Sequence, residues 1–73
     1  MNDKQVALDA CDCTQKDRVT KAASAYIDAY QMAEGKENAD ALREEAGERF
    51  KLGLGVLKEA HDSSRALVEQ IFP

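Results

Sequence analysis

The residues best suited to chemistry are two cysteines, Cys11 and Cys13, and the single histidine, His61. With Asp12 they could ligate a metal on paper, but a structural zinc normally takes four ligands from paired motifs of wider spacing. On a helix, side chains two residues apart point about 200° apart, so Cys11 and Cys13 could not hold one ion. Asp9 and Asp12 place negative charge near both thiols, which disfavours a reactive thiolate. We predict a core Cys11, a surface Cys13, and no metal or cofactor site.

His61 is followed by Asp62, Ser63 and Ser64, which are the residue types of a nucleophile, a base and an orienting acid. Such groups act together when they converge from separate elements, whereas neighbours in sequence on one helix turn away from one another. We therefore expect His61 to be a helix-capping or boundary residue, and we expect a protein that is not an enzyme.

Tyr26 and Tyr30 lie one helical turn apart and could stack on bases or form an aromatic binding patch. Ile27 lies between them and no basic residue is interleaved. The pattern favours a place in the hydrophobic core, with the hydroxyls reaching its edge. If the two tyrosines are exposed, they become the first residues to test as binding hot spots.

A row of carboxylates occupies the start of the second half of the chain and would decorate the outer face of a helix: Asp40, Glu44, Glu45 and Glu48. Such a row on a rigid helix can imitate a phosphate backbone and occupy a nucleic-acid channel on another protein. The alternative is an ordinary solvated face. Both interpretations stay open from sequence.

Apolar residues recur at helical spacing in the first half of the chain, within an arc of about 120°. They are Val19, Ala22, Ala23, Tyr26, Ile27, Tyr30 and Ala33. Thr14 could begin this helix, and Asn2 or Asp3 could begin it earlier because Leu8 and Cys11 extend the stripe. Residues 1–13 are thus part of a long helix, or a frayed or separate short one. Gly35 opens a predicted turn over residues 35–38.

A second stripe follows Asn38, a good N-cap. It contains Leu42, Ala46, Phe50, Gly53, Leu54 and Leu57, and it continues through His61, Ser64, Leu67, Val68 and Ile71. Two glycines, Gly53 and Gly55, weaken a helix there by about 1 kcal/mol each. The segment also alternates like a strand, but no partner strand exists, so we predict a helix that could kink there. A separate final helix beginning near Asp62 is the alternative for the last residues.

These stripes predict an all-α fold, an antiparallel helical hairpin over residues 1–73 as one small domain, with short extra terminal helices as an alternative. A chain of 73 residues buries only about 60% of its unfolded surface. We therefore expect the hairpin to dimerise into a helical bundle. Leu52 and Val56 point away from the predicted hairpin core, which makes them candidate partner contacts unless the amino-terminal segment covers them.

The charge balance argues against ordinary nucleic-acid binding. Fourteen acidic residues against ten basic ones give a net charge of −4 without a basic cluster. The chain has no run of about 18 apolar residues, and its first residues are too polar for a secretion signal. We expect reduced thiols, a cytoplasmic location and no membrane contact.

The leading functional hypothesis is a small acidic helical protein-binding module. It would act stoichiometrically as a regulator or inhibitor of a larger bacterial protein complex, in the manner of virus- or plasmid-encoded regulators of transcription or anti-viral defence. Its candidate partner-binding residues are Leu52, Val56, Asp40, Glu44, Glu45 and Glu48. The alternative is a homodimeric four-helix bundle with a structural or RNA-binding role, which would need Lys16, Arg18 and Lys21 to line up on the dimer face.

Overall fold

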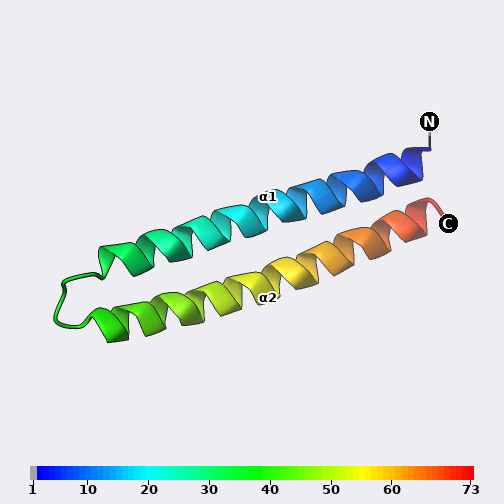
Figure 1. Ribbon diagram of the computed structural model, residues 1–73. Coiled ribbons are helices and arrows are strands. Elements are labelled where there is room, and N and C mark those ends of the chain that lie inside the picture. The colour runs from blue at the N-terminus through cyan, green and yellow to red at the C-terminus, as the bar shows by residue number, and fades with distance from the viewer. Residues whose placement is uncertain (1) are drawn as a thin grey trace.

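The computed structural model describes residues 2–73, and this part of the chain forms two helices. Helix α1 spans Asp3–Met32 and helix α2 spans Ala39–Ile71. They run antiparallel and side by side, with the connecting turn at one end and both chain ends at the other (Figure 1). The predicted all-α helical hairpin is confirmed. The Cα trace is long and flat, with extents of 55 × 19 × 7 Å.

Helix α1 begins at the amino-terminal edge of the chain. The Asn2 side-chain oxygen accepts hydrogen bonds from the backbone N–H groups of Lys4 (3.0 Å) and Gln5 (3.4 Å). These bonds satisfy two of the amide groups that a helix start leaves without partners, and Asp3 adds negative charge to the positive first turn. Helix α1 then continues without a break past Thr14, so a single long helix forms.

The turn between the helices is short and hydrogen-bonded. Ala33 donates to the Ala29 carbonyl (3.2 Å) and Lys36 donates to the Ala33 carbonyl (3.2 Å). Gly35 adopts a φ of +79°, the left-handed conformation that glycine reaches without steric cost. Asn38 precedes α2, but its side chain makes no capping hydrogen bond.

Helix α2 runs as one element through both of its weak points, the glycines at 53 and 55 and the polar residues after His61. The alternating segment is therefore helical, and no separate final helix forms within the described residues. Packing explains this outcome, because Phe50, Leu54 and Leu57 are partly covered by α1 and recur at helical spacing.

The core is a narrow seam between the helices. Only Leu8, Ala33 and Ala46 are buried among residues 2–73, and the Tyr26 ring stacks on Phe50 with centroids 5.2 Å apart. The apolar stripes predicted from sequence include more residues than the other helix covers. Ile27, Leu67 and Ile71 belong to them but are 53%, 54% and 72% exposed, because one neighbouring helix can cover only part of an arc of about 100° or more.

Candidate functional site

The two broad faces of the hairpin carry different side chains. Residues 18 apart on a helix are separated by five full turns and therefore lie on the same side. Asp12 and Tyr30 are related in this way on α1, and Arg43 and His61 on α2. Across the two helices Asp12 contacts His61, and Tyr30 contacts Arg43. We call this side the bridged face.

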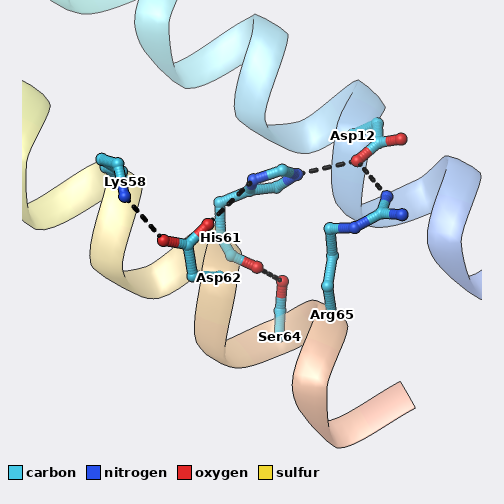
Figure 2. A network of polar contacts seen from close by, with 6 residues as sticks. All are labelled: Asp12, Lys58, His61, Asp62, Ser64 and Arg65. Carbon is cyan, nitrogen blue, oxygen red and sulfur yellow. Dashed lines mark hydrogen bonds and ion pairs between the residues drawn. The ribbon is translucent and has the colours of Figure 1, made fainter. Parts of the chain in front are cut away.

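Asp12 is the centre of the polar network on the bridged face (Figure 2). One of its carboxylate oxygens, Oδ1, lies 2.7 Å from His61 Nε2 and 2.7 Å from Arg65 Nη1. Both partners come from α2, so the Asp12 carboxylate joins the two helices. Helix α2 adds a pair of its own, in which Lys58 Nζ lies 2.9 Å from Asp62 Oδ2.

The network sets the charge of its members. Hydrogen bonds from His61 and then from Arg65 hold the pKa of Asp12 below its ordinary value of 3.8. The hydrogen bond from Lys58 likewise lowers the pKa of Asp62, and that carboxylate raises the pKa of Lys58. All three groups are therefore charged at neutral pH, and the Asp12 carboxylate faces two donors.

His61 occupies neither a cap nor a helix boundary, contrary to our expectation. It lies inside α2, its side chain is 23% exposed, and its Nε2 faces Asp12 on the other helix. The Ser64 hydroxyl donates to the His61 backbone carbonyl at 2.8 Å. That bond turns the hydroxyl toward the backbone, so Ser64 does not pair with the imidazole (Figure 2). Of the contacts drawn there, those of Asp12 with His61 and Arg65 join the two helices.

A second cross-helix contact lies near the turn on the same face. Arg43 Nε donates to the Tyr30 carbonyl at 3.2 Å, and the Arg43 guanidinium lies 4.0 Å from the centre of the Tyr30 ring. Tyr30 is 44% exposed, so the prediction of a buried tyrosine is wrong for this residue, while Tyr26 is half-buried. A hollow of about 540 Å³ lies beside the pair.

The apolar candidates for partner binding are exposed. Leu52 is 71% and Val56 is 65% exposed. Glu48, Leu52 and Val56 follow one another at four-residue spacing and therefore form a single exposed ridge along α2. Glu45 lies beside its start. We call these four residues the outer ridge.

The acidic candidates do not act as one uniform row. Asp40, Glu44, Glu45 and Glu48 are all exposed, but Glu45 pairs with Arg49, and Glu48 Oε1 lies 3.9 Å from Lys51 Nζ. Asp40 and Glu44 lie further round α2, toward the bridged face. The structure thus brings two of the acids next to the apolar pair and supplies each of those two with a nearby cation.

Cys13 is at the surface, as predicted, whereas Cys11 is only partly buried and is not a core residue. Cys11 lines a cavity together with Leu57 and Ala60 of α2. Among residues 2–73, no three His, Cys, Asp or Glu side chains are grouped so that they could hold a metal ion. Neither α1 nor α2 contains a stretch that is long and apolar enough to traverse a membrane.

Comparison with protein-family models, curated proteins and solved structures finds no match. The surfaces of the hairpin must therefore be interpreted from their own chemistry. Sequence reasoning missed Asp12, Arg43 and Arg65 as contact residues. These contacts could have been predicted only from the antiparallel register of the two helices, which places Tyr30 beside Arg43 and Asp12 beside His61. The position of the turn at Gly35 determines that register.

Proposed function

We propose that this protein is a small protein-binding module that acts stoichiometrically, regulating or inhibiting a larger bacterial protein complex. A virus- or plasmid-type regulator of transcription or anti-viral defence is the kind of protein that these features fit. One observation carries the proposal. Leu52 and Val56 are large, apolar, adjacent and more than 60% exposed on the outward side of a regular helix.

The outer ridge has the chemistry of a helix that docks into a groove. Apolar side chains at i and i+4 on a preformed helix insert together into an apolar cleft of a partner, and the helix loses little conformational freedom in doing so. Glu45 and Glu48 border the apolar pair with charges that already have intrahelical partners. This favours apolar docking over imitation of a phosphate backbone, because the nearby cations reduce the negative potential of the row.

The test is quantitative recovery of a protein partner on a tagged copy, with the partner identified by mass spectrometry. Leu52→Asp and Val56→Asp should each lower the affinity by about tenfold or more, because each places a charge in the centre of an apolar contact. Ile27→Asp is the matched control, since Ile27 is similarly exposed but lies on the bridged side of α1.

Charge reversal of Glu44, Glu45 and Glu48 to lysine separates the two mechanisms. Docking through the apolar pair predicts a change in affinity of about threefold or less, as for charges at the rim of an interface. Mimicry of a phosphate backbone predicts loss of binding. If all five substitutions leave partner recovery unchanged, neither surface binds the partner.

A homodimeric four-helix bundle, structural or RNA-binding, is the second candidate function. It is favoured by the thin core, in which only Leu8, Ala33 and Ala46 are buried among the described residues. The RNA-binding form has less support, because α1 turns Lys16 about 200° away from Arg18, and Lys21 Nζ lies 3.1 Å from Asp17. Salt-sensitive retention of RNA by the purified protein would favour it.

A further inference from the structure

The side of the hairpin opposite the bridged face is hollowed along most of its length. Three cavities follow one another in the groove between the helices, with volumes of about 550, 220 and 190 Å³. Ala10, Thr14 and Ala60 line the first cavity, Ala25 and Gly53 the second, and Met32 and Leu42 the third. We call this side the groove face.

Helical spacing confirms that these residues share a side. Thr14, Ala25 and Met32 are separated by 11 and 7 residues, which are close to three and two full turns. Leu42 and Ala60 are 18 residues apart, or five turns. Thr14 is two residues from Asp12 and therefore points about 200° away from the centre of the bridged face.

Polar bridges between the helices are concentrated on the other side. Asp12 with His61 and Arg65, and Arg43 with Tyr30, cross the bridged face. On the groove face, Arg49 forms its ion pair with Glu45 of its own helix. The third cross-helix contact, Lys4 with Glu69, lies beyond the cavities near the chain ends. The three cavities combine small apolar side chains with a few charged ones, Arg18 in the first, Arg49 in the second and third, and Lys36 and Glu45 in the third.

Large apolar side chains stand exposed at the margins of the groove face. Met32 on α1 is 71% exposed, and Leu67 and Ile71 on α2 are 54% and 72% exposed. Small residues in the floor let another helix approach closely, and the marginal side chains can insert into hollows of the same kind. A surface that presents both features is complementary to itself, which is what a two-fold interface requires.

We propose that the groove face binds a second copy of this chain, so that two hairpins pack face to face into a four-helix bundle. The inference rests on the second candidate function and names its contact surface. The area is sufficient: a face of 55 by 19 Å offers roughly 1,000 Å² per protomer, and a stable interface needs about 800 Å² per partner. Pairing also converts a two-helix seam into a core enclosed by four helices.

Sedimentation equilibrium of the purified protein over about 1 to 100 μM tests the proposal, together with thermal unfolding at each concentration. The wild type should approach twice its 8.0 kDa mass, with a Tm that rises with concentration. Met32→Glu and Leu67→Glu should each weaken the dimer by about tenfold or more, because each would place an unpaired charge inside the contact. Because both side chains are exposed in the hairpin itself, the monomer tolerates these changes.

Two controls locate the surface. Ile27→Glu, on the bridged side, and Leu52→Asp, on the outer ridge, should leave the dimer unchanged. If a dissociated variant also loses helicity by circular dichroism, dimerisation is coupled to folding, and the concentration dependence of the wild-type Tm then carries the test. The proposal is overturned if the wild type remains a monomer throughout with a constant Tm, or if Ile27→Glu separates the protomers while Met32→Glu and Leu67→Glu do not.

The outcome is independent of the protein-binding proposal. Leu52→Asp should weaken binding of the foreign partner by about tenfold or more while the dimer persists, whereas Leu67→Glu should weaken the dimer by about tenfold or more while Leu52 remains available. A monomer that still binds its partner through Leu52 would refute only the self-association. A stable dimer whose partner recovery does not depend on Leu52 would refute only the docking ridge.

Discussion

Asp12 of α1 contacts two side chains of α2, and it lies at the centre of the polar network. His61 Nε2 and Arg65 Nη1 both lie 2.7 Å from the same carboxylate oxygen. Asp12 is nevertheless about half exposed, so water competes for the carboxylate and weakens each contact. The network is therefore expected to fix the relative position of the helices more than it stabilises the fold.

Asp12→Asn should lower the Tm by a few degrees at neutral pH, because the amide keeps the shape of the side chain but loses its charge. The pKa of Asp12 is lowered in the folded state from its ordinary value of 3.8. Its contribution to stability is therefore fully present above that value and is lost as the pH falls through the folded-state pKa. Thermal unfolding followed between neutral pH and about pH 2 should show the Tm difference from wild type disappearing in acid.

Asp62→Asn is the matched control for this measurement. Asp62 has a lowered pKa like Asp12, but its main partner is Lys58 on the same helix, and both side chains are well exposed. Such an exposed i,i+4 pair contributes little to stability, because solvent screens it. An effect of Asp62→Asn as large as that of Asp12→Asn would show that the cross-helix position of Asp12 has no special importance.

Local sequence patterns predicted the two helices better than they predicted the individual contacts between them. The stripes around Tyr26 and Phe50 and the glycine at the turn were sufficient for two antiparallel helices. They could not show that each helix is continuous, because the local sequence at Thr14 and at Asp62 is compatible with a new helix start. Packing between the two helices keeps each of them continuous. Contacts such as Asp12 with His61 join residues 49 positions apart, so they follow from register, which no local pattern contains.

Replacing a glycine by alanine is expected to have opposite effects on stability at Gly55 and at Gly35. A Cβ added at Gly55 would meet nothing within 4 Å, so Gly55→Ala should stabilise α2 by about 1 kcal/mol through its greater helix propensity. Gly35→Ala should destabilise the hairpin by about 1 kcal/mol or more, because φ of +79° is strained for alanine. Urea unfolding measures both free energies. Equal effects of the two substitutions would contradict this assignment of the turn.

At the scale of the whole molecule, stability depends on a few contacts distributed along a narrow seam. Leu8 is the largest of the three buried residues in the described part of the chain, and it lies near the end away from the turn. Leu8→Ala should lower the free energy of unfolding by about 2 to 3 kcal/mol through lost burial and the cavity left behind.

Unfolding of Leu8→Ala also tests whether the hairpin unfolds cooperatively. Tyr26 and Tyr30 lie toward the turn and the chain has no tryptophan, so tyrosine fluorescence reports on the end far from Leu8. In a single cooperative unit, fluorescence and circular dichroism should give coincident transitions that shift together in Leu8→Ala. A shift seen only by circular dichroism would instead indicate local fraying of the chain ends.

The ends of the two helices also determine how this hairpin can be joined to other polypeptides. Lys4 Nζ lies 2.7 Å from Glu69 Oε2, so the first turn of α1 and the last turns of α2 are direct neighbours, far from Gly35 (Figure 1). The hairpin can therefore be inserted into a surface loop of a carrier protein without forcing that loop apart. It would then project from the carrier as a rigid arm about 55 Å long, with the Tyr30 and Arg43 pair near its tip.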